Sequence, residues 1–323
     1  MHPYRVGIVG ATGMVGQRFT LLLEHHPWFQ VTCLAASARS ARKPYREAVE
    51  GRWAFKDRPI PANVADMTVL DAAQGGEVEK MADGLNFVFC AVDMKKDEIR
   101  ALEERYARTE TPVVSNNSAN RGVSDVPMLI PEINGDHAAV IEAQRKRLGT
   151  KNGFIAVKPN CSIQSYVPAL WPLLDFEPKK VMVCTYQAIS GAGKTFERWP
   201  EMVDNVIPYI GGEEEKSERE PLKLWGHIEG DKIVSADAPR FTAQCLRVPV
   251  SDGHMAAVSV EFGKKPSLET ILERWANCHP ATEGLGLPSS PEKFLTYFDD
   301  PARPQTRLDR DLYGGMGISI GRL

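Results

Sequence analysis

Residues 5–16 of the chain read RVGIVGATGMVG and decide the fold of its N-terminal half. The apolar run Arg5–Val9 predicts a buried β-strand, and the stretch Met14–His25 predicts a helix. Glycines at a strand-to-helix turn let the backbone approach a pyrophosphate, which binds at the helix N-terminus. The stretch therefore predicts a dinucleotide site rather than a simple tight turn. Its expected contacts are Gly10, Thr12, Gly13, Met14, Val15 and Gly16.

Strand and helix signals alternate through the rest of the first half. Apolar strand-like runs cover residues 31–36, 87–92, 112–115 and 154–157, and a charged amphipathic helix is predicted over residues 97–108. Continuous apolar strands alternating with helices are typical of a parallel sheet covered on both faces. The predicted fold class is α/β, with a Rossmann-type domain over residues 1–159.

The second half has a different pattern. Its strand-like runs cover residues 180–186, 233–236, 240–250 and 255–262, and few helices lie between them. This pattern predicts an antiparallel or mixed sheet with one open face. We therefore expect a second, α+β domain over residues 160–323.

Three residues after the second predicted strand bear on the choice of cofactor. NAD enzymes normally place an acidic residue there for the ribose hydroxyls, whereas hydroxyl groups and a guanidinium suit a 2′-phosphate. This chain offers Ser37, Arg39 and Ser40. The sequence therefore favours NADP(H) over NAD(H); the alternative is an exposed basic loop.

Cys161 stands where the apolar run 154–157 gives way to a helix-like stretch, residues 163–174. A cysteine at a helix N-terminus lies among unpaired N–H groups at the positive end of the helix dipole, which favours the thiolate. The thiolate is the nucleophilic form, so Cys161 is a candidate nucleophile. Taken alone, a buried structural cysteine is an equal alternative.

Bulk composition excludes several classes of protein. With 323 residues and a net charge of −3, the chain has no bias toward nucleic acid or a membrane surface. No apolar run approaches the ~20 residues of a membrane span. Six cysteines are scattered without metal-ligand spacing, so we expect neither a metal site nor a disulfide framework, and we expect the cytoplasm as compartment.

Residues 188–195, AISGAGKT, nearly spell a P-loop after a predicted strand. The required first glycine is Ala188, and residues 196–200 break any following helix early. A nucleotide triphosphatase is therefore a minor alternative.

Arg247 and His254 are the candidate partners of Cys161. Arg247 lies in a predicted strand, and the turn Ser251–Gly253 can bring His254 to the same end of a sheet. An arginine binds a carboxylate through two hydrogen bonds, and a histidine is the usual proton carrier near neutral pH. Individually these would be a surface arginine and a polar turn residue, but together they favour a catalytic site.

Five motifs occur together and in order, and the set resembles the aspartate-β-semialdehyde dehydrogenase family, most closely its archaeal and fungal branch. The motifs are Gly10–Gly16, Pro159–Ser162, Gln187–Gly193, Gly212–Lys216 and Arg247–His254. The resemblance implies a fold like that of glyceraldehyde-3-phosphate dehydrogenase. It also implies NADPH-dependent conversion of L-aspartyl-4-phosphate to L-aspartate-4-semialdehyde, a step of lysine, threonine and methionine biosynthesis.

The resemblance also implies roles for individual residues. Cys161 would carry the acyl group, His254 would be the general acid and base, and Gln187 would orient the substrate. The substrate would be bound by Arg247 at its α-carboxylate and by Glu213 at its amino group, and its phosphate by Lys216, Arg121 and Asn160. Ser190 and Gly191 would contact the nicotinamide side of the cofactor.

Three further expectations follow from the resemblance. Family members form homodimers or homotetramers. They typically continue for some tens of residues beyond a strand that corresponds to Met316–Ile320, so we expect weaker cofactor binding by a chain without that segment. Related reductases of N-acetylglutamyl phosphate or malonyl-CoA, and an inactive binding homologue, remain alternatives.

Overall fold

In the computed structural model, residues 3–74 and 77–323 are described, and the chain divides into two compact units. The first unit comprises Met1–Leu129, His137–Lys158 and Ile228–Ile233, and the second comprises Ile130–Asp136, Pro159–His227 and Val234–Leu323. The main crossing at residues 158 and 159 lies beside the predicted boundary, but short segments of each half belong to the other unit. Among the described residues, no helix combines the length and the apolar character that a membrane span requires.

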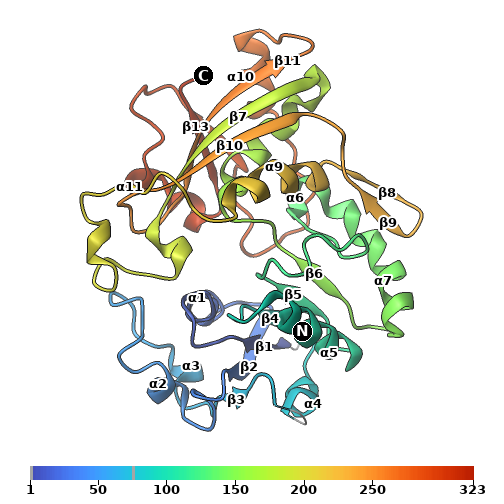
Figure 1. Cartoon of the computed structure of the whole chain (residues 1–323), viewed down its shortest axis with the longest axis vertical. Helices are drawn as coiled ribbons and strands as arrows, with labels where there is room; N and C mark the ends of the chain where they lie inside the picture. The colour runs from blue at the N-terminus through green and yellow to red at the C-terminus, as the bar shows by residue number, and fades with distance from the viewer. Residues whose placement is uncertain (1–2, 75–76) are drawn as a thin grey trace. The chain divides into compact units, whose positions relative to one another are not determined.

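A parallel six-stranded sheet forms the centre of the first unit, in the order β3-β2-β1-β4-β5-β6 (Figure 1). Its strands are β1 (Tyr4–Val9), β2 (Phe29–Ala36), β3 (Leu70–Asp71), β4 (Phe87–Cys90), β5 (Val113–Ser115) and β6 (Ile155–Val157). The helices of this unit are α1 (Met14–Leu22), α2 (Tyr45–Ala48), α3 (Ala62–Ala65), α4 (Glu77–Ala82), α5 (Lys96–Arg108) and α7 (Ile141–Leu148). The predicted parallel sheet is confirmed.

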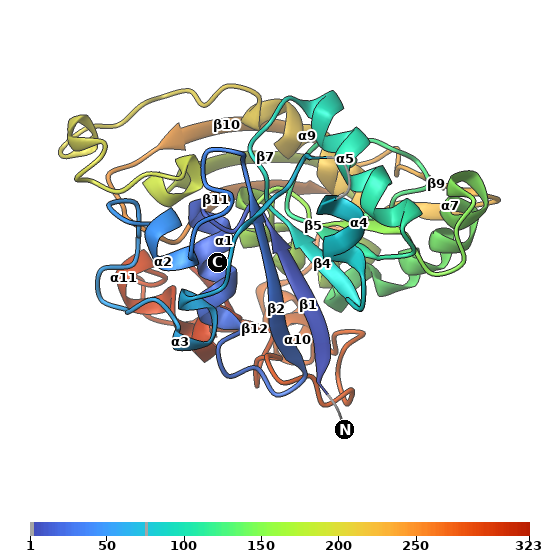
Figure 2. The same ribbon diagram turned by 90° about the horizontal axis from the view of Figure 1, so that it is seen from below.

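Helices cover both faces of this sheet because alternate residues of each strand point to opposite sides. Val6 and Ile8 of β1 pack in one apolar core with residues of α2 and α3, and Phe19 of α1 packs against the same core. Gly7, between them, faces Met81 of α4 on the other side. Figure 2 shows β1 and β2 side by side, with α1 and α4 on opposite sides of the sheet.

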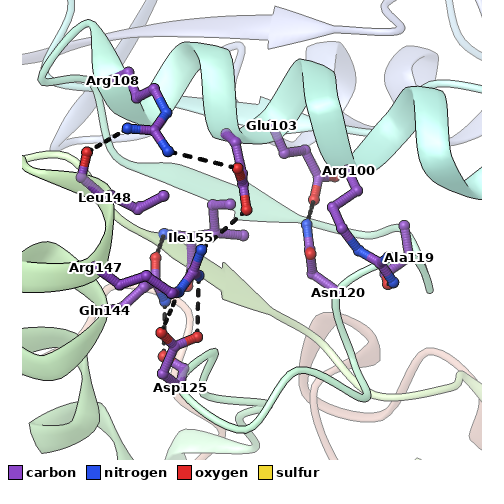
Figure 3. Close-up of polar contacts among 11 residues, drawn as sticks. Arg100, Glu103, Arg108, Ala119, Asn120, Asp125, Gln144, Arg147, Leu148 and Ile155 are labelled. Atoms are coloured by element: carbon purple, nitrogen blue, oxygen red, sulfur yellow. Dashed lines mark hydrogen bonds and ion pairs between the residues drawn. The ribbon is translucent and has the colours of Figure 1, made fainter.

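The loop after β5 is fixed to α5 by two side chains of that helix. Asn120 donates a hydrogen bond to a carboxylate oxygen of Glu103 (2.7 Å), and Arg100 donates one to the Ala119 carbonyl (2.9 Å) (Figure 3). The predicted helix over residues 97–108 is confirmed, but Glu103 within it is completely buried.

The second unit is built on a three-stranded sheet of order β10-β7-β11, with β7 (Pro178–Gln187) in the centre. β10 (Arg240–Arg247) runs parallel to β7 and β11 (Met255–Phe262) runs antiparallel to it, so the predicted mixed sheet is confirmed. The inward residues of β7 are Val181, Val183, Thr185 and Gln187, whereas Met182 on the other face is 63% exposed. The sheet therefore has one covered and one open face.

The remaining elements of the second unit surround this sheet. A smaller core joins α10 (Leu268–Ala276) to the parallel pair β12 (Leu295–Phe298) and β13 (Ile318–Gly321). The other helices are α6 (Pro131–Asn134), α8 (Val167–Leu170), α9 (Glu213–Leu224) and α11 (Thr306–Asp309). The short strands β8 (His227–Glu229) and β9 (Lys232–Val234) pair with each other, and their residues 228–233 belong to the first unit. The 3₁₀ helices are η1 (Gly135–Val140), η2 (Ser162–Ser165), η3 (Trp171–Phe176), η4 (Ile189–Ala192), η5 (Pro200–Met202) and η6 (Leu312–Gly315).

The predicted helix over residues 163–174 is wrong. This stretch is divided into η2, α8 and η3. Pro168 and Pro172 each lie in the first turn of a new helix, where a missing N–H is tolerated. Because neither proline can donate to the preceding turn, one continuous helix does not form.

Candidate active site

Cys161 and His254 face each other in the second unit. The Cys161 Sγ atom lies 3.2 Å from His254 Nε2, and Cys161 is exposed. The other ring nitrogen, Nδ1, accepts a hydrogen bond from the Ala188 backbone N–H at 3.0 Å. In the neutral ring the proton therefore resides on Nε2, the nitrogen that faces the sulfur. An accessible thiol next to an imidazole is the arrangement of an activated nucleophile.

The carboxyl end of β7 is where the partner residues meet. Gln187 is the last residue of β7 and pairs in register with Arg247, the last residue of β10. His254 directly precedes β11, whose first residue, Met255, pairs with Tyr186. The sequence predicted that Arg247 and His254 lie at the same end of a sheet, and they do. It did not predict that β7 separates their strands.

The local backbone at Cys161 differs from the expectation. Cys161 precedes η2, a four-residue 3₁₀ turn, rather than a long α-helix. A helix dipole depends on several aligned peptide units, so this short turn contributes little to thiolate stability. The His254 imidazole is therefore the group that can activate the thiol.

A buried carboxylate lies at the start of α9. Glu213 is 9% exposed and accepts a hydrogen bond from Lys216 Nζ at 2.7 Å. Asn160 Nδ2 donates to both Glu213 oxygens, at 3.1 and 2.9 Å, while Asn160 Oδ1 accepts from the Ser162 N–H. The structure thus connects the residue preceding Cys161 directly to the predicted amine-binding carboxylate.

Charge at this site is fixed by the neighbouring groups. Burial raises the pKa of Glu213, but hydrogen bonds from Lys216 and Asn160 and the Lys216 charge outweigh burial, so the pKa lies below its ordinary 4.5. Burial lowers the pKa of Arg247, and the charges of Glu213 and Cys161 oppose that effect. An arginine stays protonated in proteins. The site therefore offers one anion and one cation.

Sequence patterns did not reveal the contacts that Glu220 and Gly191 make in the site. Glu220, which is buried, accepts a hydrogen bond from the Asn160 N–H at 2.6 Å. Its position, seven residues after Glu213 on one helix face, is the signal that could have found it. A Cβ atom added to Gly191 would lie 3.0 Å from Arg247 Nη1 and 3.1 Å from His254 Cε1. Gly191 thus leaves room for both side chains.

Arg121 belongs to the first unit, in the loop after β5. It is 9% exposed, and its Nη2 donates a hydrogen bond to the Asn116 carbonyl at 3.3 Å. Its assignment to the substrate phosphate stays a prediction.

The first glycine loop fits a dinucleotide. A Cβ atom on Gly10, where φ is +92°, would lie 2.3 Å from the Ala91 carbonyl oxygen, and one on Gly16 would lie 2.2 Å from the Gly10 carbonyl oxygen. Gly13 precedes α1 without a side-chain cap, so no side chain of the cap residue occupies the first N–H groups of the helix. These groups can bind a pyrophosphate, with Thr12, Met14 and Val15 beside them.

The residues predicted to bind a 2′-phosphate do not all have the same environment. Ser37 and Arg39 are exposed after β2. Ser40 is 1% exposed, and its hydroxyl accepts a hydrogen bond from Arg52 at 3.0 Å. Ser40 therefore stabilises the turn from inside, while Ser37 and Arg39 remain available to a ligand.

Comparisons with known proteins identify the family. Residues 5–141 match the family model "Semialdehyde dehydrogenase, NAD binding domain", and residues 170–323 match "Semialdehyde dehydrogenase, dimerisation domain". The aspartate-semialdehyde dehydrogenase of Archaeoglobus fulgidus is 43% identical over 99% of this chain and 88% of that relative. The chain belongs to the aspartate-semialdehyde dehydrogenase family. The predicted resemblance, including its archaeal and fungal character, is confirmed.

Other members of the aspartate-semialdehyde dehydrogenase family agree. The enzyme of Methanothermobacter thermautotrophicus is 41% identical over 98% of this chain and 88% of the relative. The crystal structure of the Candida albicans enzyme with NADP has a TM-score of 0.86 at 34% identity and covers 99% of this chain and 89% of that one. The Rossmann-type domain followed by an α+β domain is therefore confirmed as the fold.

The P-loop alternative does not agree with membership of this family. Residues 189–192 form the 3₁₀ helix η4 rather than the start of an α-helix. Ser190 instead donates its backbone N–H to the Ser251 carbonyl at 3.1 Å. The glycine-rich segment therefore supports the turn that carries His254.

The cysteines other than Cys161 differ from it in environment. Burial raises the pKa of Cys33 and of Cys278 to about 11, and it raises the pKa of Cys90 and Cys245 as well. A raised pKa leaves little thiolate at neutral pH. These four thiols are therefore poor candidates for a nucleophile.

Proposed function

We propose that the chain catalyses the NADPH-dependent reductive dephosphorylation of L-aspartyl-4-phosphate to L-aspartate-4-semialdehyde, a step in amino-acid biosynthesis. The Cys161–His254 pair, at 3.2 Å, carries the proposal. A thiol beside a proton carrier is what acyl transfer through a thioester requires. Membership of the aspartate-semialdehyde dehydrogenase family supports the substrate.

Substrate binding follows from the charges of the site. Arg247 binds the α-carboxylate and Glu213 binds the α-ammonium group, since their charges are opposite to those of the ligand groups. Gln187 orients the acyl group at the thiol, and Asn160 holds Glu213 in place. Lys216 binds the leaving phosphate, and we assign Arg121 the same role.

Cys161 and His254 perform the covalent step. The Cys161 thiolate attacks the β-acyl carbon, a C–S bond forms, the C–O bond to phosphate breaks, and phosphate leaves with the electron pair. When bound, NADPH supplies the hydride that reduces the thioester. His254 donates a hydrogen bond from its Nε2–H group to the oxygen of the acyl carbon, as the tautomer fixed by Ala188 allows, and so stabilises the negative charge that develops on that oxygen. Cys161 then leaves as the thiolate with the electron pair of the C–S bond, and the oxyanion becomes the aldehyde carbonyl.

An ionised Glu213 favours a free amino acid over its N-acetylated analogue. A carboxylate paired with an ammonium group forms a charge-assisted hydrogen bond, whereas an acetamide offers one neutral N–H. The depressed pKa of Glu213 supports this distinction from N-acetylglutamyl-phosphate reduction.

The oligomer that we propose is a homodimer formed through the second unit. The open face of its sheet presents Met182, which is 63% exposed, and Tyr186, which is 36% exposed. Their register partners on β10 and β11 are Thr242, Leu246, Ser259 and Met255, all uncharged. This uncharged, partly apolar part of the sheet face suits contact with a second copy, while Lys180, Arg240 and Glu261 lie in register at its other end. We place the enzyme in the cytoplasm, where its free thiols would stay reduced.

One assay tests the proposed function. L-aspartate semialdehyde and phosphate should convert NADP⁺ to NADPH faster than NAD⁺ to NADH, and the rate should be negligible without phosphate. The Cys161→Ala variant should be inactive, whereas Cys184→Ser, a change on the open sheet face, should retain activity. Equal rates with and without phosphate would contradict the proposal, and so would an active Cys161→Ala variant.

A further inference from the structure

The turn that carries His254 is stabilised from two directions. On one side, the Ile189 N–H donates to the Val250 carbonyl at 2.9 Å, and the Ser190 N–H donates to the Ser251 carbonyl at 3.1 Å. These bonds fix the start of the turn, residues 250 and 251. They leave Asp252 and Gly253, which directly precede His254, to be held by something else.

Arg310, directly after α11, contacts the turn from the other side. Its Nη1 donates hydrogen bonds to Ser251 Oγ at 3.0 Å and to the Asp252 carbonyl at 3.4 Å. Gly253 has φ of +91°, and a Cβ atom added there would lie 3.1 Å from Arg310 Cβ. The backbone of the turn therefore packs directly against Arg310 at Gly253. Because glycine has only weak conformational preferences of its own, this contact helps to fix the turn.

The segment that presents Arg310 is itself rigidly held. Asp309 is 5% exposed and accepts hydrogen bonds from Arg303 Nε at 3.0 and 2.9 Å and from the Gln305 N–H at 2.6 Å. The Arg303 guanidinium lies 4.2 Å from the centre of the Phe298 ring. A charged pair with this geometry holds α11 in place, so Arg310 is fixed at its base.

We propose that Arg310 is a positioning residue for His254. It fixes residues 251–253 so that His254 Nε2 remains at hydrogen-bond distance from Cys161 Sγ, without touching the substrate or the reacting atoms. The ring has one further anchor, the Ala188 N–H on Nδ1, which orients the ring plane but does not fix the backbone of the turn. Small displacements of a proton carrier reduce rates strongly, because proton transfer requires close approach.

Three variants separate positioning from general stability. Arg310→Ala removes both hydrogen bonds, Arg310→Lys keeps a donor, and Arg307→Ala is the matched control. Arg307 lies in α11 and is exposed, and it makes no hydrogen bond or ion pair with the described part of the chain. The readouts are the rate of Cys161 alkylation by iodoacetamide at pH 7, followed by peptide mass, and kcat and KM for the semialdehyde.

For Arg310→Ala we expect alkylation and kcat to fall about tenfold, with KM changed by less than about twofold, because the nucleophile–base geometry is lost and substrate binding is not. Arg310→Lys should recover most of the loss, and Arg307→Ala should match the wild type. In a His254→Ala background, Arg310→Ala should have little further effect, since the group that it positions is gone.

Other results would overturn the assignment. They are wild-type alkylation by Arg310→Ala, an equal loss in Arg307→Ala, or a full additional loss in the His254→Ala background. If Arg310→Ala does not fold, Ser251→Ala removes one of the same hydrogen bonds and must still slow alkylation. The kinetic arm rests on the proposed function, but the alkylation arm does not. A chain without dehydrogenase activity would fail the assay with semialdehyde, phosphate and NADP⁺, and it could still show the expected changes in Cys161 alkylation.

Discussion

Glu103 in the first unit and Glu213 in the second are both buried glutamates, and they have different partners. Glu103 of the first unit is completely buried, and Glu213 of the second is 9% exposed. Glu103 accepts hydrogen bonds from neutral groups only, whereas Glu213 is paired with the Lys216 ammonium group. The two partner sets separate a buried charge that holds the fold from one that we propose to bind a ligand.

Glu103 is an anchor for one loop. It accepts hydrogen bonds from Ser115, the last residue of β5, and from Asn117 and Asn120 in the segment that follows. Among residues 3–74 and 77–323 it forms no ion pair. A buried carboxylate without a cation depends on each of its hydrogen bonds, because desolvation of the charge is expensive. The Glu103 carboxylate therefore holds residues Ser115–Asn120 in place, and these residues lead to Arg121.

Glu213 has a cation and neutral amide groups as partners. Lys216 and Asn160 share its oxygens, and Lys216 itself is 30% exposed on its side chain. A carboxylate whose charge is maintained by a partly exposed lysine can exchange a protein donor for a ligand donor. Its charge is thus available for recognition, which the charge of Glu103 is not.

The largest effect is expected on breaking the Glu103 cluster. Glu103→Ala leaves two buried donors, Ser115 and Asn120, and one partly buried donor, Asn117, without this acceptor and should lower the free energy of unfolding by about 3 kcal/mol. Urea denaturation measures this loss, and hydrogen exchange at residues 115–121 should become much faster. Lys96→Ala, an exposed position of the same helix, is the control and should leave both unchanged. An unaltered urea midpoint for Glu103→Ala would refute the anchor role.

The next effect is on activity rather than stability. Glu213→Gln keeps the shape of the side chain but removes a charge-assisted hydrogen bond worth about 1.5–3 kcal/mol, so kcat/KM should fall about tenfold to a hundredfold. Steady-state kinetics with the semialdehyde measure it. Glu215→Gln, exposed in the same helical turn, should have no effect. Equal kcat/KM values for the two variants would remove Glu213 from substrate recognition.

Acid stability gives a smaller difference with a definite sign. Because the folded-state pKa of Glu213 lies below its ordinary 4.5, ionised Glu213 stabilises the fold fully above pH 4.5, and this contribution is lost as pH falls through the folded value. The melting-temperature difference between wild type and Glu213→Gln should be constant from pH 5 to pH 7 and shrink below pH 4.5. A difference that grows on acidification would reverse the assigned direction of the pKa shift.

The smallest effect is expected for a carboxylate on the surface. Glu79 of α4 pairs with Arg105 of α5 at 2.7 Å, and its side chain is 51% exposed. Exposed pairs of this kind contribute about 0.5 kcal/mol, and salt screens them. Glu79→Gln should therefore shift the urea midpoint slightly in dilute buffer and not at all in 1 M NaCl. A shift as large as that of Glu103→Ala would show that burial does not explain the comparison.

Sequence patterns predicted strands and glycine loops better than they predicted buried charges. The apolar runs of β1, β4 and β7 allow only a buried strand, so their places were clear from the sequence. Glu103 could not be found, because it lies in a charged helix that reads as solvated, and only the fold turns it inward. Ser40 was misjudged for the same reason, since burial of a polar turn residue depends on the distant Arg52.

The sequence predicted which residues form the candidate site, but it did not predict how the strands that carry them are arranged. Motif order brought Cys161, Gln187, Arg247 and His254 together, but local pattern cannot show that β7 lies between the strands that carry the last two. The helix predicted after Cys161 does not form as one element, because the spacing of apolar residues takes no account of Pro168 and Pro172. The spacing of apolar residues does not show which strands will pair in the folded chain. It also does not show where a proline lacks the backbone N–H that a helix needs.

The central position of β7 also has a consequence for how the chain folds. Cys161 and His254 are 93 residues apart in sequence, and they meet only after β7 has paired with two later strands. Pairings of such long sequence separation form slowly, because loop closure precedes the contacts that reward it. During synthesis the thiol therefore emerges well before its imidazole. Rapid alkylation of Cys161 should appear late in refolding, as a marker that the whole second unit has closed.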